Sequence, residues 1–453
     1  MAALLRGAAP TTSGQLKVHN SDTGFPVMPE KGLTMILRIP AAALAAALPL
    51  SLFAQTQQVK PPIAVYWISA ETAGGMGIEM PPGMGGMMPP GMQGGKRMKL
   101  DLGSSQQASG DPRAAHAIPP GLALGPSLPL VTPRIERAPT REPEEEPEFE
   151  RPKGRMLIYW GCGDSVRSGQ PVIVDFANLS AQEAGRAFRS RAIARARGPA
   201  PGRNRTYGTW PNQEDSRPVP SAGSLRGEHS VAGNYSPEIR FAVSDSHDFM
   251  QAVAFDPVQK TAGGAFAVRW KAVPAATGYF ATAMGQGDSQ TDVVMWSSSE
   301  VQEMGQVLMD YIAPAEVERL IREKVVMPPR TTECTVPAGV FKGEASMFNF
   351  IAYGGELNLV HPPRPKDAKQ PWEQVWAVKL RLKSTAMIML GESEDRAQRG
   401  RAGSRQRDAE SAAPPQATPS QDAPPPQADK PQAPTPADAM QEGIKALRGI
   451  FGR

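Results

Sequence analysis

Residues 376–383, Trp-Ala-Val-Lys-Leu-Arg-Leu-Lys, carry the clearest fold signal in this chain of 453 residues. Large apolar side chains alternate there with Ala377 and with three cations, Lys379, Arg381 and Lys383. A period of two places the apolar side chains on one face of a β-strand and the cations on the other. The segment therefore predicts a strand with one buried face and one wet face.

Short runs rich in β-branched and aromatic residues precede this strand and also predict strands. They cover residues 63–68, 156–160, 172–176, 238–243, 265–271, 279–284, 292–296 and 347–352. Turns rather than helices separate most of them, which favours antiparallel pairing over a parallel α/β sheet. We therefore expect a mainly β protein of antiparallel β-sandwich modules, immunoglobulin- or fibronectin III-like. One short helix is expected at 314–326, opened by Pro314 and stopped by Pro328.

The composition adds long irregular segments to this core. The chain holds 47 Pro and 44 Gly without the Gly-X-Y period of collagen. This excludes a coiled coil and a polytopic membrane protein. It predicts a disordered loop at 74–95, a disordered insertion at 103–155, a basic and polar loop region at 181–237 and a disordered Pro/Ala/Gln linker at 391–434.

Between these segments the chain divides into β modules. A first module is expected at 55–180, a second at 238–312, and a helix with a C-terminal β segment at 313–390. An amphipathic helix is expected at 435–453, where Met440, Ile444, Leu447 and Phe451 share one face. It would dock on an envelope protein or a membrane surface, or fold back onto its own core.

One segment resembles a known family. Residues 268–279, VRWKAVPAATGY, are similar to the strand–turn–strand core of fibronectin type III domains. The resemblance implies that Trp270 fills a sandwich core, that Pro274 sets the turn and that Tyr279 re-enters the sheet. Ala275 stands where the family often has Gly. Such modules mostly bind or space other molecules, and the resemblance names no ligand.

The N-terminal region predicts export. Residues 35–54 have a basic start at Arg38, a short apolar stretch and a cleavage position near Ala54, which is the layout of a signal peptide. An uncleaved anchor is the alternative, and residues 1–34 are interpreted as a non-native extension. Residues 1–54 carry four Lys/Arg and two Asp/Glu, so their removal lowers the net charge from +4 to +2. We expect a periplasmic or secreted protein that does not bind nucleic acid.

Two cysteines, Cys162 and Cys334, lie 172 residues apart beyond this signal. In an oxidising compartment they can pair and join two distant parts of the core. The alternative is two separate buried thiols.

The sharpest ligand candidate is a methionine cluster in the 74–95 loop. Thioethers are soft ligands that select Cu(I) without deprotonation, which makes an envelope copper site the alternative interpretation of this loop. We interpret the run as a low-complexity loop that binds no metal and leaves the protein without a cofactor. The candidate ligands are Met76, Met80, Met84, Met87, Met88 and Met92.

Other motifs carry weaker signals. Seven arginines between 181 and 205 would bind phosphate or an anionic surface, form a solvated loop, or pair with the acidic run at 142–150. The Gly161–Cys162–Gly163 segment lacks the Lys of a phosphate-binding loop and is interpreted as a tight turn. Residues 244–248 hold Ser, His and Asp, but adjacency in sequence is not triad geometry. We therefore predict an exported cell-envelope protein of binding or structural type, with copper binding and hydrolysis as alternatives and no catalytic residue assigned.

Overall fold

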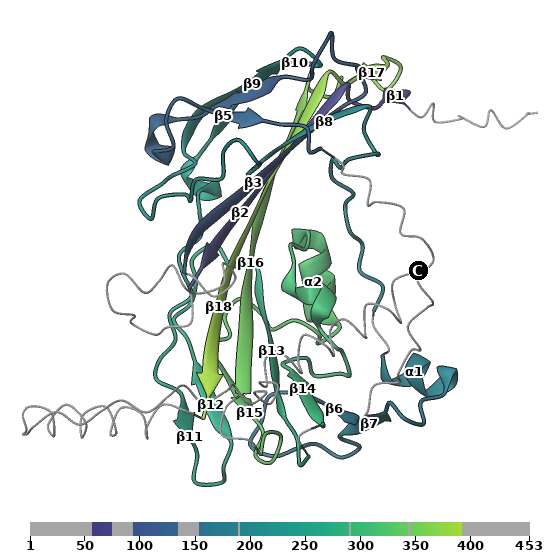
Figure 1. The fold of residues 1–453 in the computed structure, drawn as a ribbon, viewed down its shortest axis with the longest axis vertical. Helices are drawn as coiled ribbons and strands as arrows, with labels where there is room; N and C mark the ends of the chain where they lie inside the picture. Colours follow the sequence, from purple (N-terminus) through teal and green to yellow (C-terminus); the bar gives the residue numbers. More distant parts are fainter. Residues whose placement is uncertain are drawn as a thin grey trace, which may run out of the picture. The chain divides into compact units, whose positions relative to one another are not determined.

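The structure is a computed structural model that describes residues 57–74, 94–134, 154–188, 191–289, 291–342 and 346–391. Within these ranges the chain is mainly β, as expected, with two α-helices and four sheets (Figure 1). All of these elements belong to one unit that begins at Gln55.

The largest sheet has nine strands in the order β7-β6-β14-β13-β16-β18-β2-β3-β8. Neighbours are antiparallel, except that β6 runs parallel to β14 and β2 parallel to β18, so the sheet is mixed. The strands are β2 (Ala64–Ala73), β3 (Gly95–Ser104), β6 (Arg155–Trp160), β7 (Val172–Asp175), β8 (Thr206–Trp210), β13 (Gly278–Gln286), β14 (Val293–Ser297), β16 (Ser346–His361) and β18 (Trp376–Leu390).

Three smaller sheets complete the described fold. The first has the order β10-β9-β4-β5 and consists of β4 (Ala114–Ala117), β5 (Ser127–Leu130), β9 (Gly227–Gly233) and β10 (Ser236–Val243). The second has the order β11-β12-β15 and consists of β11 (Gln259–Lys260), β12 (Phe266–Arg269) and β15 (Glu333–Val336). The third is a parallel pair of β1 (Val59–Lys60) and β17 (Trp372–Glu373). Short 3₁₀ turns lie at η2 (Pro120–Leu122), η3 (Asp245–His247) and η4 (Gln306–Met309).

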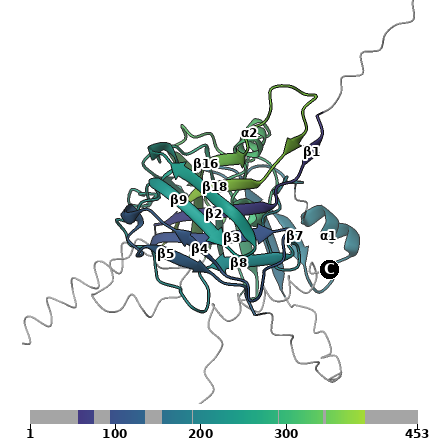
Figure 2. The same cartoon turned by 90° about the horizontal axis from the view of Figure 1, so that it is seen from above.

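Both larger accessory sheets cover the same face of the nine-stranded sheet at different ends. The four-stranded sheet packs on β2 (Figure 2). There the Tyr66 ring lies 6.3 Å from that of Phe241. The three-stranded sheet packs on β13 and β16, where the ring of Trp270, directly after β12, lies 4.7 Å from that of Phe350. One continuous apolar core joins the two contacts.

The alternation that predicted the strand at 376–383 is confirmed. Val378, Leu380 and Leu382 are at most 4% exposed on the covered face, and each contributes roughly 1.5–3 kcal/mol through burial. Lys379 and Arg381 fall between them on the opposite face. The strand continues to Leu390 because it pairs with β16 and β2 along its length.

Helix α2 (Pro314–Arg322) lies on that opposite face, beside β16 and β13 (Figure 1). Its Val317 and Leu320 are fully buried. The helix stops at Arg322, short of Val326, so the expected C-terminal boundary is wrong. It stops early because Lys324 takes a left-handed φ of 61°, which redirects the chain and places Val325 and Val326 in the core.

A second helix, α1 (Ala181–Ala187), lies where the sequence predicts a loop. It begins with a capping box, in which the Ser180 hydroxyl accepts from the Glu183 N–H and the Glu183 carboxylate accepts from the Ser180 N–H. The Ser-x-x-Glu spacing is visible in the sequence, but the surrounding arginines favour a loop interpretation.

Two predicted irregular segments are ordered where the structure describes them. The insertion expected at 103–155 is wrong for residues 103–134, which hold β4, β5 and the fully buried Leu128. The loop region expected at 181–237 is also wrong, because it contains α1, β8 and β9. In both, a few apolar side chains pack on other strands and stabilise elements too short to be recognised by periodicity. Residues 75–93, 135–153 and 392–453 lie outside the described residues, and so do the extension at 1–34 and the signal segment at 35–54.

The nine-stranded sheet draws strands from each of the segments that the sequence analysis separated. β2, β3, β6 and β7 come from 55–180, β8 from 181–237, β13 and β14 from 238–312, and β16 and β18 from 313–390. The segments are therefore joined by long-range pairing within one unit.

The fibronectin-like segment crosses between two sheets. β12 belongs to the three-stranded sheet and β13 to the nine-stranded sheet, and the buried Trp270 and Tyr279 rings lie 5.6 Å apart between them. The Tyr279 hydroxyl accepts from the Val273 N–H at 3.0 Å. Ala275 adopts a left-handed φ of 62°, a conformation that favours glycine.

A disulfide also connects these two sheets. Cys162 follows β6, Cys334 lies in β15, and their sulfurs are bonded at 2.03 Å. The Gly163 N–H donates to the Thr335 carbonyl beside the bond. The cross-link therefore fixes the three-stranded sheet against the edge region of the large one.

Candidate functional site

The face of β18 and β2 that points away from the accessory sheets carries stacked cations and aromatic rings. The Arg381 guanidinium lies between the Trp67 ring at 4.9 Å and the Tyr311 ring at 4.3 Å. Lys383 lies 4.6 Å from the Tyr311 ring centre and 3.7 Å from the Glu71 carboxylate. Because these cations already have aromatic or acidic neighbours, the row stabilises the sheet rather than presenting free charge.

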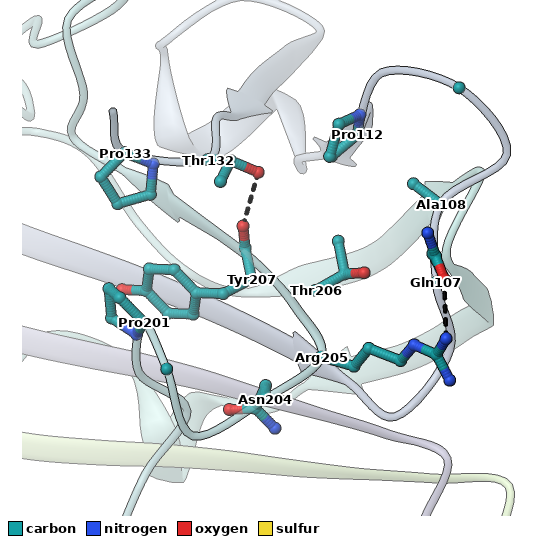
Figure 3. A pocket seen from close by; sticks show the side chains of 12 residues that line it. Gln107, Ala108, Pro112, Thr132, Pro133, Pro201, Asn204, Arg205, Thr206 and Tyr207 are labelled. Atoms are coloured by element: carbon teal, nitrogen blue, oxygen red, sulfur yellow. Dashed lines mark hydrogen bonds between the residues drawn. The ribbon is translucent and has the colours of Figure 1, made fainter. Parts of the chain in front are cut away.

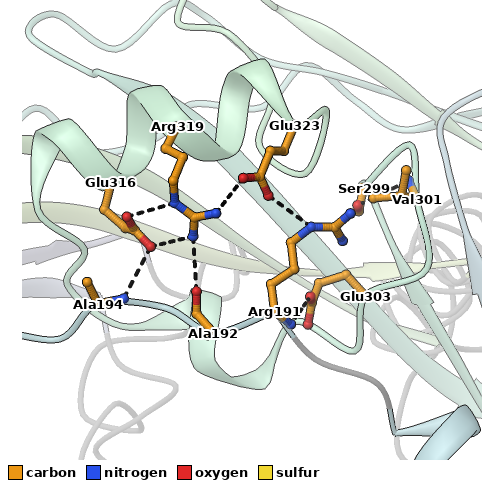
Figure 4. Close-up of polar contacts among 9 residues, drawn as sticks. All are labelled: Arg191, Ala192, Ala194, Ser299, Val301, Glu303, Glu316, Arg319 and Glu323. Carbon is orange, nitrogen blue, oxygen red and sulfur yellow. Dashed lines mark hydrogen bonds and ion pairs between the residues drawn. The ribbon is translucent and has the colours of Figure 1, made fainter. Parts of the chain in front are cut away.

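Residues 191–205, here called the strap, cross this face without forming a helix or strand. The N-terminal end of the strap is bound to acidic side chains around α2 (Figure 4). The Arg191 N–H donates to Glu303 at 3.1 Å, and its guanidinium donates to Glu323 at 3.0 Å. The Ala194 N–H donates to Glu316 at 3.2 Å.

Arg319 organises these contacts from within α2. Its guanidinium donates to Glu316 on one side and Glu323 on the other, and also to the Ala192 carbonyl at 3.0 Å (Figure 4). The hydrogen bond from Arg319 lowers the pKa of Glu316. Glu316 is thus held ionised, and both carboxylates are oriented toward the strap.

The middle of the strap approaches the sheet closely. A Cβ at Gly198 would lie 2.7 Å from the Trp67 ring, so only glycine allows this approach. On either side of it, Arg195, Arg197, Arg203 and Arg205 are exposed, and none has a carboxylate partner among the described residues. The strap therefore presents a cationic surface.

A pocket of about 470 Å³, in the size range of small-molecule sites, lies where the strap meets β8 (Figure 3). Arg205 and Gln107 lie along one side of it, and the Arg205 guanidinium donates to the Gln107 side-chain oxygen at 2.7 Å. The Tyr207 ring and two prolines, Pro133 and Pro201, lie toward the other side. The pocket thus combines apolar walls with a charged edge.

A buried polar chain links the large sheet to the four-stranded sheet. The Tyr66 hydroxyl lies 2.8 Å from His116 Nδ1, His116 Nε2 lies 2.9 Å from His229 Nδ1, and His229 Nε2 lies 2.7 Å from the Leu225 carbonyl. A carbonyl only accepts, so His229 Nε2 donates and His229 Nδ1 accepts from His116. His116 Nδ1 then accepts from Tyr66. One neutral tautomer of each histidine satisfies every group.

Burial is the main cause that lowers the pKa of both histidines. For the pKa of His116 the neighbouring His229 adds to this effect. For the pKa of His229 the hydrogen bond to the Leu225 carbonyl and the charge of Glu228 oppose it. Both imidazoles are therefore neutral at neutral pH and hold the two sheets together as hydrogen-bonding groups.

Two of the motifs singled out from the sequence, the methionine cluster and the glycine-rich segment, have different outcomes in the structure. The six loop methionines, Met76 to Met92, lie outside the described residues. At the glycine-rich segment the Gly161 and Gly163 N–H groups donate to the Ser297 and Thr335 carbonyls, so they are not free to bind phosphate.

The Ser/His/Asp segment at 244–248 does not form a catalytic relay. His247 Nδ1 lies 2.9 Å from the Ser246 hydroxyl, but the Asp248 carboxylate accepts from Ser224 and the Leu225 N–H instead. No cluster of three or more metal-ligating His, Cys, Asp or Glu side chains occurs in the described ranges. None of the helices described there has the length and hydropathy of a membrane span.

Sequence reasoning missed the histidine chain and the pocket. His116 and His229 are 113 residues apart, and no local pattern connects them. Arg205 and Gln107 are separated by 98 residues. The arginine-rich composition of the strap was a signal for the pocket, and the sequence offered no comparable signal for the histidine chain.

No family model, curated protein or solved structure matches this chain.

The strap contacts predict a local effect of Arg319→Ala. Loss of the guanidinium frees Glu316 and Glu323, so we expect amide hydrogen exchange at Ala194 to accelerate about three- to tenfold. Exchange mass spectrometry of residues 191–197 measures this change. Arg322→Ala, an exposed arginine on the same helix, is the control, and equal exchange in the two variants would contradict the assigned role.

The histidine chain predicts a loss of stability in acid. The unfolded chain takes up protons below about pH 6.5, whereas the folded histidines, with lowered pKa values, do not. The stability that the chain contributes is therefore fully present above about pH 6.5 and falls below it, by up to about 1.4 kcal/mol per pH unit for each histidine.

Urea unfolding between about pH 5 and 8 tests this prediction. The double variant His116→Gln/His229→Gln is expected to be less stable at neutral pH but to depend less on pH. His247→Gln, which changes a partly exposed histidine, is expected to keep the wild-type slope. A wild-type slope in the double variant would show that other groups cause the acid sensitivity.

Proposed function

We propose that this chain is an exported cell-envelope protein of binding or structural type. The observation that supports it most directly is the bond between Cys162 and Cys334. Structural disulfides persist in oxidising compartments and are rare in the cytosol. Cys334 is 3% exposed, so the pair is built into the core rather than placed at a reactive surface.

The position of the fold along the chain supports the same proposal. The first described residue is Gln57, and the unit that contains all described elements begins at Gln55. Cleavage near Ala54 would therefore leave every described strand intact. The strap and pocket supply a surface suited to binding.

Cell fractionation with N-terminal sequencing of the mature protein tests the compartment. We expect a periplasmic or secreted chain that starts near Gln55 and whose two cysteines resist alkylation until they are reduced. The variant Cys162→Ser/Cys334→Ser controls for the alkylation assay. A full-length, reduced chain in the cytoplasm would contradict the proposal.

Copper binding through the methionine loop is a second proposal. One observation favours it: Ala73 of β2 pairs with Gly95 of β3, so both ends of the methionine-rich connection are held together. Six thioethers thus belong to one connection whose two ends are paired, which limits the chain entropy lost when several of them bind one ion.

Titration of the purified mature protein with Cu(I) under anaerobic conditions tests this second proposal. Changing the six methionines to serine is expected to lower the Cu(I) affinity by about tenfold or more. A control with Pro81, Pro82, Pro89 and Pro90 changed to serine keeps all six thioethers and is expected to bind as the wild type does. Equal affinity in the methionine variant would exclude the loop as the copper site.

A further inference from the structure

We propose that the pocket between the strap and β8 binds a small organic anion through a carboxylate or phosphate group. The inference goes beyond the proposed function by naming a ligand class. It rests on the proposed binding role of the protein and is independent of its proposed export.

The hydrogen-bond directions at the pocket favour an anion. The Gln107 side-chain oxygen accepts from Arg205, which leaves the Gln107 NH₂ group as a donor. The Asn204 oxygen accepts from the Ala200 N–H at 3.2 Å, so its NH₂ is also a donor. The remaining Arg205 N–H groups have no carboxylate partner among the described residues. For these three donor groups, the described residues provide no matched acceptor.

The hydroxyl groups at the pocket are already used elsewhere. Thr132 donates to the Tyr207 carbonyl at 2.7 Å, and Thr206 donates to the Gln106 carbonyl at 2.8 Å. The Tyr207 hydroxyl donates to the buried Asp101 carboxylate at 2.5 Å, on which Lys99 also forms an ion pair at 2.9 Å. Asp101 is thus neutralised by its own partners and does not oppose an anion beside Arg205.

The apolar residues that line the pocket indicate what the non-anionic part of the ligand is like. Pro112, Pro133 and Pro201 line the pocket together with Ala108 and the Tyr207 side chain. A volume of about 470 Å³ is much larger than one phosphate group and lies within the usual range of small-molecule sites. We therefore expect an anionic group on a body with an apolar face, since guanidinium groups bind carboxylate and phosphate oxygens in pairs.

Isothermal titration calorimetry of the full chain with phenyl phosphate, benzoate and neutral benzyl alcohol tests the proposal. The wild type is expected to bind both anions about tenfold or more tightly than the alcohol. Arg205→Gln is expected to weaken anion binding about tenfold or more. Arg197→Gln is the matched control, because Arg197 is an exposed strap arginine outside the pocket lining.

Two further measurements distinguish the role of charge from that of guanidinium geometry, and a lipid ligand from a soluble one. Arg205→Lys keeps the charge but loses the paired donors, so intermediate affinity supports the guanidinium geometry. Cosedimentation with phosphatidic acid vesicles that depends on Arg205 would assign the anion to a lipid headgroup, and binding of phenyl phosphate alone assigns a soluble ligand. No anion binding by the wild type, or equal binding by Arg205→Gln, would overturn the proposal. A cytoplasmic location would contradict only the proposed compartment.

Discussion

The parallel pairing of β18 with β2 holds the described fold together. Ten residue pairs, from Trp376 opposite Ala64 to Thr385 opposite Ala73, join strands 312 positions apart in the chain. On one side of this pair lie β3 and β8, and on the other lie β16, β13, β14, β6 and β7. Without this pairing the nine-stranded sheet would divide into two sheets. The continuous apolar core would then no longer pack against a single sheet.

The two faces of this pair have different roles because their side chains alternate. The covered face is apolar and packs on the accessory sheets through Tyr66 and Leu380. The opposite face carries Lys379, Arg381 and Lys383, whose charges are compensated by neighbouring carboxylates and rings. The strap adds its exposed arginines, Arg195, Arg197, Arg203 and Arg205, on this side of the sheet.

Two kinds of connection fix the accessory sheets against the large one. The three-stranded sheet is cross-linked through Cys162 and Cys334. The four-stranded sheet is joined by the directed hydrogen bonds of Tyr66, His116 and His229. The first connection depends on the redox state of its surroundings and the second on their acidity, so the two ends of the fold respond to different conditions.

The sequence alone determined the mainly β class and located several strands with strong alternation or apolar runs, such as 376–383. It did not reveal β4 (AAHA), β5 (SLPL) or β9 (GEHSVAG), because these segments carry few β-branched or aromatic residues and are stabilised by packing on strands formed elsewhere in the chain. β3 could have been predicted from the sequence, since Met98, Leu100 and Leu102 alternate with charged residues. Only the tertiary structure decided the partners of each strand, the histidine chain and the pocket beside Arg205. His116 and His229 are 113 positions apart and Arg205 and Gln107 are 98 apart, and such long-range contacts are fixed by the packing of whole faces rather than by any local pattern.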